Sequence, residues 1–121
     1  SADLVMFWWN HAADLLREQQ LHRFGFITTN SLKQTFNRRV LENHMNSKQP
    51  LSLVFAIPDH PWVDNADGAA VRISMTVAVT GQKIGRLLTI DVEEDIGQDE
   101  PELSISTARG SLHADLRIGA K

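Results

Sequence analysis

Residues 24–31 constrain the fold of this chain more than any other segment, because an apolar run stops there abruptly in polar residues. Residues 24–28 are short, aromatic and β-branched, as is typical of a strand. Thr29, Asn30 and Ser31 follow at once, and helical periodicity occurs on both sides of the segment. Ligand sites of open α/β sheets lie at such junctions, outside the carboxyl ends of the strands. The pattern therefore predicts half of a doubly wound α/β domain.

An amphipathic helix is predicted before this strand, over residues 3–18, with its apolar face on the sheet and Asp3 as its cap. Trp8 and Trp9 occupy consecutive helix positions, so they cannot both face the core. We expect one of them to lie at the border with a missing part of the protein. The apolar residues at helical spacing are Val5, Trp8, Ala12, Leu15 and Leu16.

A second helix is predicted after the strand, over about residues 32–45, because Ser31 and Gln34 have the spacing of a capping box. Residues 51–57 are almost continuously apolar, which is typical of a parallel strand buried on both faces. The Pro-, Asp- and Gly-rich residues 58–68 then predict a long polar loop.

The later strands are predicted from alternating apolar and polar residues. Residues 69–80 form a two-faced strand in which Val71, Ile73, Met75, Val77 and Val79 alternate with smaller or polar residues. Since no helix precedes them, they most simply pair antiparallel with the strand before. Residues 81–85 are interpreted as the turn of a hairpin whose second strand is residues 86–92. The acidic residues after Glu93 predict a solvated link, and a last alternation hints at a strand leaving the domain. Its apolar residues are Leu112, Ala114, Leu116 and Ile118.

Composition narrows the classes of protein. The chain has 121 residues, a net charge of −3 and no cysteine, which excludes disulfides and thiolate metal sites. It has no apolar stretch near the roughly 18 residues of a membrane span, so we expect a cytoplasmic protein that does not contact a membrane. Its five histidines show no spacing for zinc. Pro58 and Asp59 begin a nuclease-like pattern, but no lysine follows an acid at the required spacing, so a hydrolase is rejected.

This order of segments resembles the C-terminal half of class I S-adenosylmethionine-dependent methyltransferases, and within them the adenine-N6 DNA methyltransferases of restriction-modification. The resemblance is carried by four segments in order, which are residues 5–9 (VMFWW), 24–31 (FGFITTNS), 34–40 (QTFNRRV) and 57–63 (IPDHPWV). It implies a Rossmann-like fold with a mixed sheet, two helices, and two parallel strands followed by an antiparallel β-hairpin. Residues 1–95 would be the C-terminal half of the catalytic domain, and residues 96–121 an acidic link and the start of a following segment.

The resemblance also implies what this piece lacks. The family's glycine-rich cofactor loop and its Asn/Asp-Pro-Pro-aromatic motif are absent from the sequence. The parent enzyme would therefore methylate adenine N6 in double-stranded DNA with S-adenosylmethionine bound mainly by the upstream half of the same polypeptide. The fragment would be inactive alone, with no catalytic or cofactor-binding residue of its own.

Substrate contacts are expected at the strand ends, because a base must leave the duplex and be held by stacking and edge hydrogen bonds. The resemblance places a stacking aromatic in residues 58–68, where Trp62 is the only large aromatic side chain. Thr28, Thr29, Asn30 and His60 complete the predicted substrate-binding set. Two alternatives stay open: Trp62 covers the sheet edge, or Asn30 serves only as a helix-entry residue.

A different class of function remains as an alternative. The chain would then be a non-catalytic α/β protein-interaction module that binds through its three tryptophans. In either case, a tryptophan exposed by the missing half would favour self-association of the isolated fragment. Arg38 and Arg39 either meet phosphate or are simply solvated, and solvation is the commoner state of helix charges.

Overall fold

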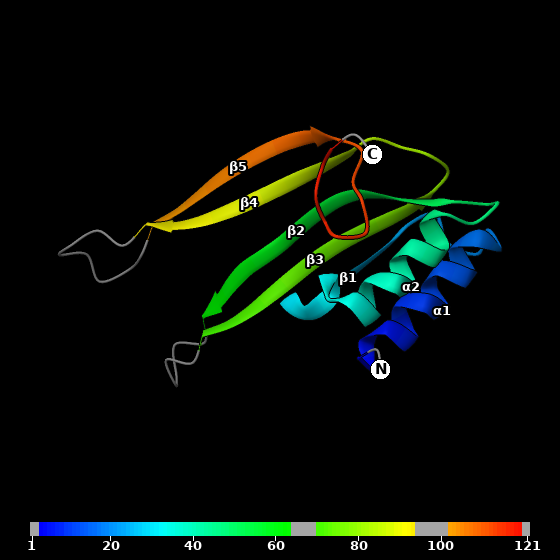
Figure 1. Ribbon diagram of the computed structural model, residues 1–121, viewed down its shortest axis with the longest axis horizontal. Coiled ribbons are helices and arrows are strands. Elements are labelled where there is room, and N and C mark those ends of the chain that lie inside the picture. The colour runs from blue at the N-terminus through cyan, green and yellow to red at the C-terminus, as the bar shows by residue number, and fades with distance from the viewer. Residues whose placement is uncertain (1–2, 64–69, 94–101, 120–121) are drawn as a thin grey trace.

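The described part of the chain folds into a mixed five-stranded sheet with two α-helices (Figure 1). The computed structural model describes residues 3–63, 70–93 and 102–119. Its elements, in order, are α1 (Val5–Arg17), β1 (Phe24–Thr29), the 3₁₀ turn η1 (Asn30–Lys33), α2 (Thr35–Met45), β2 (Leu51–Val63), β3 (Ala70–Thr80), β4 (Gly85–Glu93) and β5 (Glu102–Gly110). The predicted α/β class, mixed sheet and two helices are confirmed.

The strand order is β1-β3-β2-β4-β5. β3 lies between β1 and β2 and is antiparallel to both, so β1 and β2 run in the same direction without pairing. β4 lies on the other side of β2, parallel to it, and pairs antiparallel with β5. The predicted antiparallel pairing of β3 with its predecessor is confirmed. The predicted hairpin of residues 69–80 with residues 86–92 is wrong, because β4 pairs with β2 and β5.

The connection between β3 and β4 explains that difference. Gly81 adopts a left-handed conformation (φ 85°) and its N–H donates to the carbonyl of Pro50 at 2.9 Å. The Ser52 hydroxyl donates to the carbonyl of Gly81 and accepts from the N–H of Lys83. The connection is therefore bonded to the beginning of β2, which carries the chain past β2 and places β4 on its far side.

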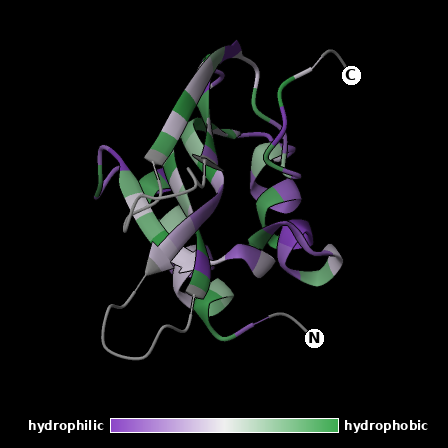
Figure 2. Ribbon diagram, turned by 90° about the vertical axis from the view of Figure 1, so that its left-hand side faces the viewer, coloured by the Kyte–Doolittle hydropathy of each residue, from purple (hydrophilic) through white to green (hydrophobic). Residues whose placement is uncertain are grey.

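Both helices lie on one side of the sheet (Figure 2). Trp9 of α1 and Leu41 of α2 are fully buried against it. On β3, the small side chains of Ser74, Thr76 and Ala78 face the helices and are buried. The apolar side chains of Met75, Val77 and Val79 therefore face the opposite side. Within the described ranges, no helix covers that side.

The buried face of α1 differs from the prediction. It consists of Met6, Trp9, Ala12, Ala13 and Leu16. Trp9 is 0% exposed and Trp8 is 54% exposed, which confirms that the two side chains do not share the core. The helix is oriented by Trp9, whose indole N–H donates to the Thr76 hydroxyl at 3.3 Å and whose ring packs edge-on against Phe24 at 5.0 Å.

Neither predicted helix cap forms. Leu4 is the N-cap of α1, and the Asp3 carboxylate instead accepts hydrogen bonds from the Ser31 hydroxyl and the Asn37 amide. Ser31 lies inside η1, and α2 begins only at Thr35 without a side-chain cap. The Ser31–Gln34 capping box is therefore wrong, because the Ser31 hydroxyl is used in a tertiary contact.

The polar loop predicted for residues 58–68 is wrong over its first half. Pro58, Pro61 and Trp62 belong to β2, and the other residues from 64 to 68 lie outside the described part of the chain. The strand tolerates Pro58 because the register with β3 shifts between Ile57 and His60, and prolines occur in sheets at such irregularities. The acidic link predicted after Glu93 falls on residues 94–101, which also lie outside the described ranges.

The C-terminal segment returns to the domain instead of leaving it. Leu112, Ala114 and Leu116 are buried in the same core as the helices, and a single bridge joins Leu112 to Ile118. The strand that the last alternation hinted at is therefore absent from residues 111–119. None of the described helices is long and apolar enough to cross a membrane.

Gly85 marks a close approach at the beginning of β4. A Cβ atom there would lie 2.5 Å from the carbonyl oxygen of Leu53 and 2.6 Å from Cδ1 of Leu112. We expect Gly85→Ala to lower the free energy of unfolding by at least about 1 kcal/mol in urea titrations, because β2 or Leu112 must move. Gly119→Ala is the control, since nothing lies within 4 Å of a Cβ at that position. Equal effects of the two changes would contradict this packing.

The two helices are joined by the buried ring of His44. Its Nε2–H donates to Asn10 Oδ1 at 2.6 Å, and Arg17 donates to its Nδ1 at 3.0 Å, so the ring is neutral. Burial, followed by the positive charge of Arg17, lowers the pKa of His44.

This lowered pKa predicts a pH dependence of stability. Below about pH 6.5 the unfolded chain binds a proton at His44 more readily than the folded chain does. The stability that the neutral His44 ring contributes to the folded chain is therefore fully present above that pH and is lost as the pH falls. In urea titrations, the free energy of unfolding should fall between pH 8 and pH 5, and this fall should be smaller in His44→Gln than in the unaltered chain. His22→Gln, at an exposed position, should keep the wild-type dependence; an unchanged dependence in His44→Gln would refute the assignment.

Candidate functional site

The candidate site lies where β1 and β2 end. Since both strands are antiparallel to β3, their carboxyl ends lie at the same end of the sheet. Thr29 and His60 both pair with Ile73, one from each side, and Trp62 pairs with Val71. Directly paired residues share a face of the sheet. The structure thus places Thr29, His60 and Trp62 on the face away from the helices, with Thr29 and His60 about 10 Å apart across β3.

Trp62 and His60 differ in how free their side chains are. Trp62 is 53% exposed, so its ring is accessible to a ligand. His60 is partly buried, and its Nδ1 lies 2.7 Å from the carbonyl oxygen of Pro61, which is the geometry of a protonated Nδ1 that donates. When Nδ1 carries the only ring proton, Nε2 is left as a hydrogen-bond acceptor. The pair therefore offers one stacking surface and one hydrogen-bond acceptor.

Thr28 faces the other side of the sheet. It is buried, it pairs with Ser74, and its hydroxyl donates to the carbonyl of Thr29 at 2.9 Å. The structure therefore does not bring Thr28 onto the face that carries Trp62. Both threonines nonetheless border a hollow of about 510 Å³ at this end of the sheet, which is lined by Asp3, Val5, Ile27, Thr28, Thr29 and Ile73.

Asn30 is held by the ion pair of Asp59 and Arg72, two residues that the sequence pattern does not predict to belong to the site. Its amide lies 3.5 Å from Asp59 Oδ1, and Arg72 Nε lies 2.6 Å from the same oxygen. The hydrogen bond from Arg72 lowers the pKa of Asp59, so this carboxylate is charged at neutral pH. Asp59 thus links the end of β1 to β2 and β3. The one signal in the sequence that could have pointed to Asp59 as a site residue is its position among residues 54–62 (VFAIPDHPW).

Thr29 is connected to a second polar cluster. Its hydroxyl lies 2.6 Å from that of Ser31, and the Ser31 hydroxyl donates to Asp3 at 2.6 Å. The Asn37 amide donates to the Asp3 carboxylate and to the Ser31 carbonyl. The hydrogen bonds from Ser31 and then Asn37 lower the pKa of Asp3. These contacts attach the beginning of α1 to the polar end of β1, which positions Thr29.

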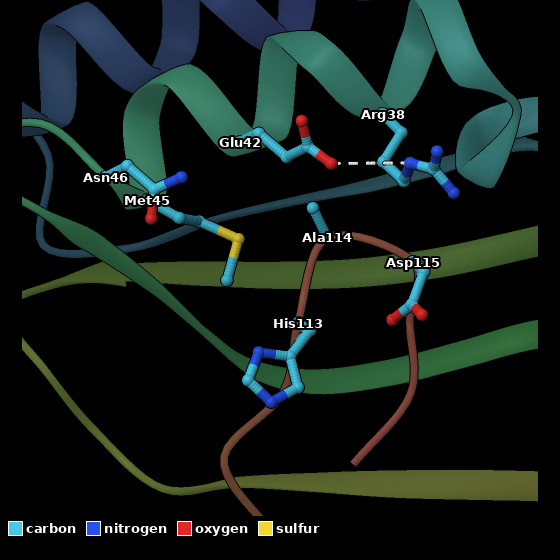
Figure 3. Close-up of a pocket in the computed structure, with 7 residues that line it drawn as sticks. All are labelled: Arg38, Glu42, Met45, Asn46, His113, Ala114 and Asp115. Carbon is cyan, nitrogen blue, oxygen red and sulfur yellow. Dashed lines mark ion pairs between the residues drawn. The ribbon is translucent and has the colours of Figure 1, made fainter. Parts of the chain in front are cut away.

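A separate hollow of about 360 Å³ lies between α2 and the C-terminal segment (Figure 3). Its Arg38 side chain pairs with Glu42 at 3.3 Å, and His113 Nε2 lies 2.6 Å from the carbonyl oxygen of Gly119. Arg39 lies over the ring of Phe36 at 5.5 Å. Arg38 is thus paired with a carboxylate, and this hollow contains none of the predicted substrate residues.

Within the described ranges, no three His, Cys, Asp or Glu side chains are grouped so that they could hold a metal ion. Besides the carboxylates of Asp3 and Asp59 and the guanidinium of Arg72, the strand ends carry amide, hydroxyl and imidazole groups and an aromatic ring. Such groups bind and orient a planar ligand with hydrogen-bonding edges. They do not form a nucleophile–base pair.

Comparison with known proteins gives two matches. The family model described as MmeI, DNA-methyltransferase domain, matches residues 1–89. The fold is similar to a solved structure of the type IIL restriction-modification enzyme MmeI in complex with DNA, with a TM-score of 0.67 and 22% sequence identity. That match covers 98% of this chain and 15% of the other, so the chain spans about one seventh of that protein. No curated protein matches.

Proposed function

Because the chain belongs to the MmeI DNA-methyltransferase domain family, we propose that it is the C-terminal part of the catalytic domain of a restriction-modification DNA methyltransferase. The parent would be cytoplasmic and would transfer a methyl group from S-adenosylmethionine to adenine N6 in double-stranded DNA. The observation that carries the proposal is the convergence of Thr29, His60 and Trp62 at one end of the sheet. In open α/β sheets, ligands bind at that end.

The arrangement of the sheet supports the view that this is one part of a larger domain. β1 is an edge strand of the sheet, and within the described ranges it pairs only with β3. An unpaired strand edge is a site for pairing with further chain. We propose that the upstream half of the same polypeptide continues a Rossmann-like sheet at β1.

The cofactor is assigned to that upstream half. The sequence contains no glycine-rich loop that joins a strand to a helix. S-adenosylmethionine supplies the methyl group when it is bound. The residues of this chain would hold the acceptor base, and the fragment alone would be inactive.

The role of each site residue follows from its surroundings. Trp62 would stack on the extruded adenine, because it is the exposed aromatic ring at this end of β2. His60, Thr29 and Asn30 would contact the edges of the base or its sugar. Asn30 is pre-oriented by Asp59. Thr28 would not contact the base itself, and its hydroxyl would fix the main chain at Thr29. Such a site accelerates transfer by positioning, without a covalent intermediate.

Methyl transfer by the full-length parent tests this proposal. Double-stranded DNA is incubated with the enzyme and with S-adenosylmethionine carrying a labelled methyl group, and the modified nucleoside is identified by mass spectrometry. We expect N6-methyladenine from the parent and no product from the 121-residue chain. Methylated cytosine or methylated protein would refute the substrate assignment.

A non-catalytic interaction module is the second candidate function. It is favoured by the exposed Phe7 and Trp8 on α1, whose rings pack edge-on at 5.1 Å. The two proposals differ in the upstream reading frame, which for a methyltransferase must encode a glycine-rich loop and an Asn/Asp-Pro-Pro-aromatic motif.

The exposed rings of Phe7 and Trp8 also lead us to expect self-association of the isolated chain, which sedimentation would detect.

A further inference from the structure

The face of the sheet away from the helices carries a second feature, at the opposite end from Trp62. A hollow of about 780 Å³ opens there, over the beginnings of β2 and β4 and the end of β3. Its floor is apolar and is formed by Phe55, Val77 and Val79. Phe55 and Val77 are directly paired across β2 and β3, so they form one continuous surface.

The border of this hollow is basic. Arg23, Lys83 and Arg86 line it, and none of its lining residues is acidic. Arg86 also pairs directly with Arg109 across β4 and β5. Like charges in that position repel each other. Among the described residues, none of these four cations takes part in an ion pair.

Two properties of this surface call for a specific kind of occupant. Ile84 projects at its border and is 65% exposed, beside an apolar floor that no described helix covers. Covering the floor and Ile84 would remove apolar surface from contact with water, which is favourable. Carboxylates at the border would neutralise the repulsion between Arg86 and Arg109. An amphipathic helix with acidic residues beside its apolar stripe provides both.

Duplex DNA fits this surface less well. Phosphate recognition uses arginine and lysine together with hydroxyl, amide and main-chain N–H groups. Here the centre of the surface is aliphatic and aromatic, so a DNA backbone would bury apolar side chains against charged phosphates. The hollow also lies at the end of the sheet away from the proposed base-binding residues.

We propose that this hollow, with Ile84, its three lining cations and the neighbouring Arg109, is the docking site for an amphipathic helix with acidic flanks that another part of the parent polypeptide supplies. Both described helices lie on the other face, and the chain spans only 15% of the structure it matches. The inference rests on the proposed function only in taking the chain as part of a longer polypeptide. It does not depend on which base is methylated.

Photo-crosslinking in the full-length parent tests the proposal. A photoreactive amino acid replaces Ile84, and the crosslinked peptide is identified by mass spectrometry. We expect a segment of the same polypeptide with helical apolar spacing and flanking Asp or Glu. The same photoreactive residue in place of Phe36, which is exposed on α2, is the control and should not capture that segment. Capture of added duplex DNA, of a second copy, or of no segment would overturn the proposal.

Charge reversal separates electrostatic docking from simple proximity. The double variant Arg86→Glu and Arg109→Glu should reduce the crosslink yield by about tenfold or more, because it places like charges against the acidic flank. Reversal of the acidic residues in the captured segment to lysine should restore the yield in that variant. Unchanged yield in the double variant, or no recovery, would refute the acidic partner. Methyl transfer is measured separately, so failure of this inference is distinguishable from failure of the proposed function.

Discussion

Replacing Trp9 by alanine is expected to lower the free energy of unfolding by about 3–5 kcal/mol. The side chain is fully buried, and it joins α1 to the sheet through the Thr76 hydroxyl and the ring of Phe24. Its removal leaves a cavity and an unpartnered hydroxyl beneath the helix. Far-UV circular dichroism of the 121-residue chain in increasing urea measures the change.

The neighbouring tryptophan supplies a matched control. Trp8 has the same side chain and the same helical backbone but is mostly exposed, so Trp8→Ala should change the free energy of unfolding by less than about 1 kcal/mol. If Trp8→Ala were the more destabilising change, α1 would pack in the orientation that the sequence predicted. The experiment therefore tests directly which face of α1 meets the sheet.

Replacing Trp62 by alanine in the full-length parent is expected to weaken binding of the extruded target base by about 1–3 kcal/mol, or about 5- to 150-fold. The reason is the loss of a stacking surface that the structure leaves exposed. DNA with 2-aminopurine at the target adenine reports this step, because its fluorescence rises when the base leaves the stack. The rate of methyl transfer to unmodified DNA should fall in parallel.

Two further substitutions separate stacking from coverage of the sheet edge. Trp62→Phe keeps an aromatic face and should retain most of the fluorescence change and activity. Trp62→Leu keeps apolar coverage without a π surface and should behave like Trp62→Ala. If leucine restored the parent's behaviour, Trp62 would be a cover for the sheet edge, which is the alternative that the sequence left open.

The polar network around Asn30 shows how much of the site could be predicted. The position of Thr29 and Asn30 at the end of a strand followed from the local pattern of apolar and polar residues. That Asp59 and Arg72 hold Asn30 did not follow, because the three side chains come from three separate strands or turns. Contacts between residues 13 and 29 positions apart in the sequence leave no periodic signal.

Local patterns determined the kind and order of the elements. Apolar spacing of 3.6 or 2 residues is a property of a short segment, and it predicted α1, α2 and β3, whereas short apolar runs predicted β1 and β2. Strand order was decided only in the tertiary structure. β3 lies between β1 and β2, and the bonds of Ser52 to the chain at Gly81 and Lys83 carry β4 past β2.

Which face of each element is buried was also a tertiary outcome. Periodicity showed that α1 and β3 each have two faces, but Trp9 is buried because Thr76 and Phe24 meet it from the sheet. The small face of β3 lies under the helices since it leaves room for that ring, and the apolar face lies on the side that no described helix covers (Figure 2). A sequence specifies the chemistry of each face, whereas the choice between faces depends on shape complementarity with segments far away in the chain.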